Sequence, residues 1–454
     1  MAQAPTSIVW FERDLRLADH AALTAAAERG RVLVLFVAPP SVAAGWAPGA
    51  ASRWWLHHSL KVLQAALAEH QVALQVLCDE PEQALQRAVE ASGADAIFCS
   101  APLEPSLQAR NQALAAQFDD QGVDFVEQGG ALLHDPFALR SSAGSPFKVF
   151  TPFWKHCREQ LLAAPPAPLP APDRLVDAGV ELPGAATVDE LGLLPEIAWD
   201  EGFYDAWQPG EAGAQQALEE FIDTALRSYA EDRDRPDRAG TSRLSPHLHF
   251  GEISPAQVFQ AVMDSDLEAA KYLAEVGWRD FGHHLLLNFP HTATEPMDAR
   301  FTQFPWRDPD SDAQAAADLR AWQRGETGIE LVDAGMRELW RTGWMHNRVR
   351  MVVASFLTKN LLIHWSHGAR WFWDTLVDAD LASNTLGWQW TAGCGADAAP
   401  FFRIFNPDLQ AQRFDPQGIY RRRWLGSGPR PDPIVDLKAT RARALEAFAV
   451  IKQG

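Results

Sequence analysis

Cysteine is scarce in this sequence. The four cysteines, Cys78, Cys99, Cys157 and Cys394, are scattered, and no two form a CxxC pair. A zinc or iron–sulfur box of that kind is therefore excluded, and so few thiols suit a reducing compartment. No apolar run approaches the ~20 residues of a membrane span. Residues 1–7 also lack the basic and apolar stretches of a signal peptide, so we expect a cytoplasmic protein without a membrane partner.

Two nucleotide-binding signatures are missing as well. Short β-branched runs alternate with helical patterns over the first 130 residues, which predicts a doubly wound parallel sheet. Yet no GxGxxG follows the first run, and no GxxxxGK[ST] occurs anywhere. A nucleotide held by a phosphate loop is therefore not expected in this domain. The expected strands are 7–11, 32–37, 72–78, 94–99 and 123–126, and the expected helices are 52–69 and 81–91.

The second half of the chain has no strand signal. A proline-rich connector at 164–173 and an irregular stretch to about Gly210 come first. Apolar residues then recur at helical spacing, beginning with a stripe from Ala217 to Tyr229. Further helices are expected at 256–263, 331–340, 347–363 and 369–377. We therefore expect an α/β domain at 1–130, a linker at 131–210 and an all-helical domain at 211–454.

Positive charge is in the minority, with a formal net charge of −19. Residues 335–424 nevertheless carry 11 Lys and Arg against 7 Asp and Glu, a net +4. A basic face on an acidic body fits a DNA-binding cleft, and it fits a solvated helix face equally well. Tryptophan is abundant: 11 of the 18 lie in the last 177 residues. Buried indoles normally pack, but this number suggests a second role in stacking or in relaying electrons.

Three local patterns suggest binding chemistry. Residues 238–245 (RAGTSRLS) combine a glycine, hydroxyls and guanidinium groups, which suits an anion, although a Thr-Ser pair also makes an ordinary helix cap. Arg350 and Asp378 suit a clamp on an isoalloxazine edge, or an inter-helical ion pair. The histidine pairs 247/249 and 283/284 lack a third ligand at useful spacing, so no metal is expected.

Several stretches, in this order, resemble the photolyase/cryptochrome family. The first is 9–16 (VWFERDLR), and the flavin-domain matches are 240–246, 344–351, 387–390 and 397–407 (DAAPFFRIFNP). The resemblance extends over nearly the whole chain. It implies an α/β antenna domain followed by a large helical domain that binds FAD.

The resemblance implies a set of FAD contacts. They are Tyr229, Thr241, Ser242, Arg243, Leu244, Ser245, Tyr272, Arg350, Asp378, Asp380 and Asn384. Asn384 matches the position that faces flavin N5. Plant cryptochromes have an aspartate at that position. Because an amide cannot give a proton to the flavin, it helps to keep the reduced anionic form.

A lesion pocket and DNA contacts are implied in the same way. The pocket residues are Glu275, Trp278, Asn347, Met351 and Trp390, and the phosphate contacts are Arg279, Arg348 and Arg403. The lesion is expected to flip out of UV-damaged double-stranded DNA between two indoles, photolyases being an established example of base flipping. Animal-type (6-4) photolyases have histidine at the positions that match Asn347 and Met351. Neither residue titrates here, so a cyclobutane pyrimidine dimer is the favoured lesion.

The remaining implied roles concern electrons and the antenna. Trp388, Trp365 and Trp306 match the indole chain that carries electrons to FAD from the surface. Residues 52–56 and 385–386 resemble the class III branch. The Asn-Glu pair that grips folate in some class I enzymes is Ser106-Leu107 here, so Trp54 and Trp55 either stack an antenna differently or simply pack. Methenyltetrahydrofolate is favoured over a deazaflavin.

The expected function is light-dependent repair of cyclobutane dimers, a carbon–carbon lyase reaction driven by an electron from reduced FAD. We expect a monomer in the cytoplasm, on the nucleoid when bound to DNA. The alternative is a cryptochrome-type photoreceptor without repair activity, against which the lesion pocket and Asn384 argue. An iron–sulfur photolyase is disfavoured because the helical half contains only Cys394. A plain flavoprotein oxidoreductase would need a nicotinamide fingerprint, which the sequence lacks.

Overall fold

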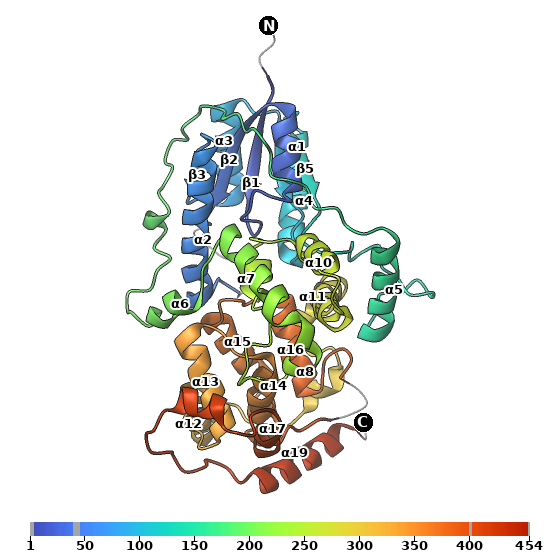
Figure 1. Ribbon diagram of the computed structural model, residues 1–454, viewed down its shortest axis with the longest axis vertical. Helices are drawn as coiled ribbons and strands as arrows, with labels where there is room; N and C mark the ends of the chain where they lie inside the picture. The colour runs from blue at the N-terminus through green and yellow to red at the C-terminus, as the bar shows by residue number, and fades with distance from the viewer. Residues whose placement is uncertain (1–3, 40–45, 399–401, 453–454) are drawn as a thin grey trace.

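A five-stranded parallel sheet begins the chain, in a computed structural model that describes residues 4–39, 46–398 and 402–452. The strands are β1 (Thr6–Phe11), β2 (Arg31–Val37), β3 (Leu74–Leu77), β4 (Ala96–Ser100) and β5 (Asp124–Gln128). Their order in the sheet is β3-β2-β1-β4-β5. The chain therefore builds outward from β1 to one side and then returns to build the other side (Figure 1).

Helices cover both faces of this sheet. They are α1 (Ala21–Arg29), α2 (Ala50–Glu69), α3 (Pro81–Ser92) and α4 (Pro105–Asp119). Val9 and Phe11 of β1 pack with α1 and α2, whereas Ile8 and Trp10 pack with α3 and α4. Alternate side chains of the strand are thus buried on opposite faces, which explains the nearly continuous apolar runs in the sequence. The predicted doubly wound sheet is confirmed.

The segment that follows the sheet remains attached to it. It contains α5 (Phe150–Ala163), the 3₁₀ turn η2 (Asp189–Leu191) and α6 (Glu201–Ala206). The Val32 N–H donates to the Val176 carbonyl at 2.8 Å, and the Ala178 N–H donates to the Val32 carbonyl at 2.9 Å. Leu175 and Val188 are buried in the same core as α1 and α2. We keep the division of the chain at residues 130 and 210 as a proposal.

The rest of the chain is helical, as predicted. The helices and turns are α7 (Glu211–Thr224), η3 (Leu226–Ser228), α8 (Tyr229–Asp232), α9 (Ser245–His249), α10 (Pro255–Asp264), α11 (Ala270–Asn288), η4 (Pro290–Ala293), η5 (Ala299–Gln303), α12 (Ala313–Arg324), α13 (Glu330–Thr342), α14 (Asn347–Ser355), η6 (Phe356–Asn360), α15 (Trp365–Thr375), α16 (Leu381–Ala392), α17 (Pro407–Phe414), α18 (Ile419–Leu425) and α19 (Leu437–Lys452). In Figure 1 this part lies below the sheet, with α5 at the outer edge beside α11. Its largest core is centred on α13 to α16.

Two predicted helices are interrupted. The stripe from Ala217 to Tyr229 is one helix by its periodicity, but α7 ends at Thr224 and a 3₁₀ turn leads into α8. The predicted helix 347–363 changes at Phe356 into the π-helical turn η6. That turn encloses Lys359, whose fully buried ammonium donates to the Ala392 carbonyl at the end of α16. A cation is favourable at a helix C-terminus, and burial lowers the pKa of Lys359 well below its ordinary value.

Two neighbouring tryptophans of α2 join the sheet domain to the segments that follow it. Trp55 Nε1 donates to Glu252 Oε1 at 2.9 Å, and the other Glu252 oxygen contacts His247 Nδ1. Trp54 packs edge-on against Phe203 of α6, with ring centroids 5.3 Å apart. Both indoles are fully buried. Of the two roles considered for them, packing is the one that this arrangement supports.

The pair provides a matched test of the interface. Within the described residues Trp54 Nε1 has no hydrogen-bond acceptor, whereas Trp55 Nε1 donates to a buried carboxylate. Trp54→Phe and Trp55→Phe remove similar volumes, but only the second leaves Glu252 Oε1 without its indole donor. We expect Trp55→Phe to lower the free energy of unfolding by about 1.5–3 kcal/mol more than Trp54→Phe. Denaturant titrations of both variants measure this difference, and equal losses would contradict it.

Candidate functional site

The loop from Gly240 to Ser245 connects α8 to α9 in a constrained conformation. A Cβ at Gly240 would lie 2.8 Å from the Asp232 carbonyl oxygen, so a larger residue does not fit there. Arg243 has a φ of +54°, in the left-handed region that few non-glycine residues adopt. Its guanidinium lies over the Trp207 ring, 4.1 Å from the centroid, and 5.1 Å from that of Trp344. The structure therefore fixes a cation inside the predicted phosphate-binding loop.

The predicted tyrosines lie beside this loop. Burial raises the pKa of Tyr272 to about 12, and a hydrogen bond with the Ser242 side chain acts against that rise. The Tyr229 ring is edge-on to Tyr272, with centroids 5.2 Å apart. Both tyrosines are buried, as is Leu244, and belong to one small core. These predicted FAD contacts thus share one region, formed by α8, α11 and the loop.

The Arg350–Asp378 pair joins three segments that are distant in sequence. Arg350 Nη2 donates to the two Asp378 oxygens at 3.1 and 2.8 Å, and Ser245 Oγ donates to Asp378 Oδ2 at 2.6 Å. Arg350 Nε donates to the Met345 carbonyl at 2.7 Å. The predicted ion pair is present, and it brings the end of the loop to the predicted isoalloxazine clamp.

Asp380 and Asn384 lie at the start of α16. Asp380 caps the helix by accepting from the Ser383 N–H at 2.8 Å, and it lies 3.4 Å from His283 Nε2 and 3.6 Å from His249 Nδ1. Burial alone would raise the pKa of Asp380, but the two imidazoles and Arg279 hold it well below its ordinary value. The carboxylate is therefore ionised. Asn384 is buried, and its amide nitrogen donates to the Ala369 carbonyl at 2.9 Å.

An unpaired donor among these residues bears on whether a cofactor suits them. In the described part of the chain, Arg243 Nε is buried without a hydrogen-bond partner. A buried donor left without an acceptor costs stability. A ligand with phosphate and carbonyl oxygens would satisfy such donors. The arrangement therefore fits FAD at the predicted positions.

The predicted lesion residues come from several elements. Glu275 and Trp278 are one turn apart on α11. Asn347 is the exposed first residue of α14, and Met351 follows one turn later, half-buried. The half-buried Trp390 on α16 has the Arg403 guanidinium over its ring, 4.9 Å from the centroid.

Two arginines link α11 to α14. Glu275 is hydrogen-bonded to Arg233, a residue that the sequence analysis missed. Arg233 Nε lies 3.9 Å from Asp234, which also pairs with Arg348 Nη2 at 2.8 Å. The predicted carboxylate and the start of α14 are therefore connected through one charged chain. No sequence signal distinguishes Arg233 from the other arginines between residues 227 and 243.

Arg279 is more enclosed than Arg403, another predicted phosphate contact. Its guanidinium donates to the Ala131 carbonyl at 2.8 Å and to the Leu248 carbonyl at 3.3 Å, and the side chain is 15% exposed. Arg403, by contrast, is exposed. The geometry gives Arg279 an internal role, so its prediction as a DNA contact has less support than that of Arg403. The motif at 397–407 is described only in part, because residues 399–401 lie outside the described residues.

The predicted electron-transfer tryptophans run from the core toward the surface. Trp388 and Trp365 are buried, whereas Trp306 is half-exposed. The His364 ring lies between the last two, with its centroid 5.2 Å from Trp306 and 5.3 Å from Trp365. The close packing of α15 against α16 depends on Gly368, where a Cβ would clash with the Trp388 ring.

A buried acid was also missed by the sequence analysis. Glu338 Oε2 accepts from the Tyr420 hydroxyl at 2.6 Å and from the His346 N–H at 3.2 Å. Burial raises the pKa of Glu338 to about 7, although these bonds and the charges of Arg243 and Arg350 act against the rise. A single glutamate on a helix gives no sequence signal of this environment.

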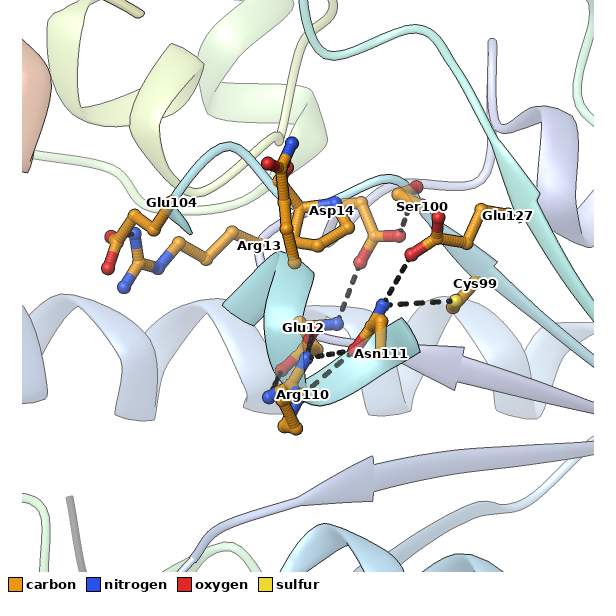
Figure 2. A network of polar contacts seen from close by, with 11 residues as sticks. Glu12, Arg13, Asp14, Cys99, Ser100, Glu104, Arg110, Asn111 and Glu127 are labelled. Carbon is orange, nitrogen blue, oxygen red and sulfur yellow. Dashed lines mark hydrogen bonds and ion pairs between the residues drawn. The ribbon is translucent and has the colours of Figure 1, made fainter. Parts of the chain in front are cut away.

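The α/β part carries a polar network of its own, shown in Figure 2. It lies at the carboxyl ends of β1 and β4, the switch point where doubly wound sheets bind ligands. Arg110 makes two bonds to Glu12, at 2.9 and 2.7 Å, and Asn111 Nδ2 donates to Glu127 Oε1 at 2.7 Å. Asp14 accepts from Ser100 Oγ at 2.6 Å. The polar side chains at this edge are therefore hydrogen-bonded to one another.

Comparisons with known proteins agree with this arrangement. A family described as "DNA photolyase" matches residues 7–173, and one described as "FAD binding domain of DNA photolyase" matches residues 272–430. The chain belongs to the photolyase/cryptochrome family. The family prediction is confirmed, and so is the fold of an α/β domain followed by a helical FAD-binding domain. The predicted contacts Tyr229 and Thr241–Ser245 lie outside the matched residues.

Individual relatives include photo-lyases and cryptochromes. A deoxyribodipyrimidine photo-lyase of Agrobacterium fabrum is 40% identical over 481 residues, which cover 98% of each chain. Cryptochrome-2 of Arabidopsis thaliana is 36% identical over 436 residues, covering 92% of this chain and 70% of the cryptochrome. The crystal structure of a class III photolyase from Agrobacterium tumefaciens has a TM-score of 0.93 at 40% identity, covering 100% of this chain and 99% of that one.

No helix among the described residues is both long and apolar enough to cross a bilayer. No group of three or more His, Cys, Asp or Glu side chains in the same part of the chain is arranged to hold a metal ion.

Glu338 makes the stability of the protein depend on pH. Because folding raises its pKa to about 7 from 4.5, the folded state binds this proton more tightly than the unfolded state does. The contribution is complete at low pH and is lost as the pH rises through 7. Glu338→Gln keeps an acceptor for Tyr420 but does not titrate. Relative to the wild type it should therefore gain up to about 3 kcal/mol of unfolding free energy between pH 5 and pH 8.

Denaturant titrations at both pH values measure this gain. Glu219→Gln, on the exposed surface of α7, is the control and should respond to pH in parallel with the wild type. If wild type and Glu338→Gln respond to pH in parallel, Glu338 does not titrate in this range.

Proposed function

We propose that this chain is a class III deoxyribodipyrimidine photo-lyase that binds UV-damaged double-stranded DNA and splits cyclobutane pyrimidine dimers in blue light. The observation that carries this proposal is the charged chain from Glu275 on α11 through Arg233 and Asp234 to Arg348 on α14. Trp278 lies one turn from Glu275, and the non-titrating Asn347 and Met351 lie on the same helix as Arg348. Similarity to the Agrobacterium photo-lyase over 98% of both chains supports it.

The cofactor of the reaction is FAD, for which the helical domain is built. The loop 241–245, Tyr229, Tyr272 and the Arg350–Asp378 pair would hold it, with Asp380 and Asn384 at the start of α16. When bound, FAD supplies the electron that opens the dimer and receives it back. Trp388, Trp365 and Trp306 would bring electrons from the surface to restore the reduced cofactor.

The chain's own residues bind and polarise the lesion. Trp278 and Trp390 offer flat apolar surfaces for a flipped-out dimer. The Arg233 guanidinium at Glu275 offsets the carboxylate charge, so negative charge that develops on the dimer is not repelled. Asn347 and Met351 supply no proton, which suits ring opening without proton transfer. Arg348 and Arg403 contribute positive charge for the DNA backbone.

A cryptochrome-type photoreceptor is the second candidate, because plant cryptochromes are among the relatives. An amide at Asn384 argues against it, since the amide cannot donate a proton to the flavin. The charged chain of Glu275, Arg233, Asp234 and Arg348 also argues against it, because a photoreceptor has no need to orient a glutamate toward a DNA lesion. We further propose a monomer that acts in the cytoplasm on nucleoid DNA.

The antenna is proposed to be methenyltetrahydrofolate rather than a deazaflavin. Because Trp54 and Trp55 are fully buried, we expect the folate to bind elsewhere on the molecule. Protein purified in the dark should release a folate on denaturation, identified by mass spectrometry, in addition to FAD. Trp54→Phe should leave the released amount unchanged. Release of a deazaflavin, or of FAD alone, would contradict the proposal.

Repair itself is tested with oligonucleotides that carry one cyclobutane dimer. Reduced protein should split the dimer under blue light, leave it intact in the dark, and leave a (6-4) photoproduct intact in both conditions. Glu275→Ala removes the partner of Arg233 and should lower the repair rate by about tenfold or more, the loss expected for one charged active-site contact. Its flavin absorption should remain that of the wild type.

Glu219→Ala is the matched control, because Glu219 is exposed on α7. It should repair at the wild-type rate. If the wild type fails to split the dimer in light, the photoreceptor becomes the better-supported function. Loss of flavin from Glu275→Ala would show that Glu275 belongs to the cofactor site instead.

A further inference from the structure

Three aromatic rings form a column next to the predicted lesion pocket. Trp278 stacks face to face on Phe150, with ring centroids 3.9 Å apart and planes inclined by 10°. Phe150 is in turn nearly parallel to Trp154, at 6.3 Å and 7°. Phe150 and Trp154 belong to α5, one turn apart, and Trp278 belongs to α11. The column therefore joins the segment between the domains to the helix that carries Glu275.

The column depends on a close approach of α5 to α11. A Cβ at Gly277 would clash with the Trp154 ring, so the residue before Trp278 must be glycine for the two helices to pack this closely. Phe150 is 8% exposed, and its ring also meets Phe281 edge-on at 5.8 Å. Phe150 is thus held by α11 on two sides. Its position relative to Trp278 is fixed by backbone packing.

The start of α5 also lies near the other side of the pocket. Asp397 belongs to the connection that follows Trp390 and α16. Burial raises the pKa of Asp397, while Arg403 and the backbone N–H of Phe150 act against the rise. Phe150 therefore lies close to the connection that follows Trp390 as well as to Trp278, the two indoles assigned to the lesion.

We propose that Phe150 is a positioning residue for the lesion: it covers one face of Trp278 and fixes the ring plane, so that a flipped-out pyrimidine dimer adds to the other face as the next layer. This inference rests on the proposed repair function. An indole that is already oriented loses less conformational freedom on binding, which increases affinity. Stacked aromatic pairs add to this through their preferred geometry. The effect should therefore appear in dimer binding and not in the repair step.

Ordinary core packing is the competing role for Phe150, because it shares a small apolar cluster with Phe153, Phe281 and Leu285. The two roles predict different consequences for other aromatic residues of α5. Phe153 is fully buried in the same helix and contacts Phe281 but is not part of the column. Its loss should affect stability without affecting the plane of Trp278.

The test compares Phe150→Leu, Phe150→Tyr and the matched control Phe153→Leu, each as full-length protein with FAD bound. Dissociation constants are measured in the dark for an oligonucleotide with a cyclobutane dimer and for its undamaged counterpart. The ratio of interest is the dissociation constant of the undamaged oligonucleotide divided by that of the dimer. Phe150→Leu should reduce this ratio by about three- to tenfold, because it weakens binding of the dimer alone. In steady-state repair its KM should rise by the same factor, with kcat unchanged. Phe150→Tyr keeps a flat aromatic ring and should keep the wild-type ratio.

Phe153→Leu should lower the melting temperature while keeping the wild-type ratio. Trp154→Leu removes the outer ring of the column and should reduce the ratio by about twofold; it decides the question if Phe150→Leu fails to retain flavin. The inference is overturned if folded Phe150→Leu, or Trp154→Leu in its place, keeps the wild-type ratio. An equal reduction of the ratio in Phe153→Leu would overturn it as well. If the wild type itself does not prefer the dimer, or Trp278→Leu does not reduce that preference, the proposed function fails first.

Discussion

The ion pair between Arg350 and Asp378 organises the helical domain. It joins α14 to the connection between α15 and α16, and the Ser245 hydroxyl adds the loop before α9. The surrounding groups depend on this pair. Asp380 caps α16 two residues later, and Glu338 faces the same arginine from α13. A buried ion pair stabilises only when its remaining hydrogen bonds are satisfied. Here the serine and the Met345 carbonyl meet that requirement.

The elements of the sheet could be predicted from the sequence, and the family resemblance led to the proposed site residues, whereas the partners of those residues could not be predicted. Strands with both faces buried give continuous apolar runs, which is why β1 to β4 were located. The edge strand β5 has no fully buried residue and was located from the short run at 123–126. The breaks after Thr224 and at Phe356 were missed because the apolar periodicity continues through them. Arg233 and Phe150 were missed for a related reason. Their importance arises only when α8 and α5 approach α11, and local sequence carries no information about that approach.

The two ends of the site differ in the charge of their side chains. Around the predicted lesion pocket, Asn347 and Met351 cannot titrate, and the charge of Glu275 is offset by Arg233. At the predicted flavin clamp, Asp378 and Asp380 are surrounded by arginine and histidine. The first environment suits a reaction in which only electrons move. The second is rich in positive charge and holds the pKa of Asp380 well below its ordinary value.

The attachment of residues 175–188 to the sheet bears on how the protein is made. Leu175 and Val188 complete the core beneath α1 and α2, and Val32 of β2 pairs with Val176 and Ala178. These contacts bridge about 140 residues, and pairings so distant in sequence form late. During synthesis from the N-terminus, the sheet would emerge well before its last covering segment. An incomplete core would then wait, with β2 partly unpaired, until α5 and the segment behind it had left the ribosome.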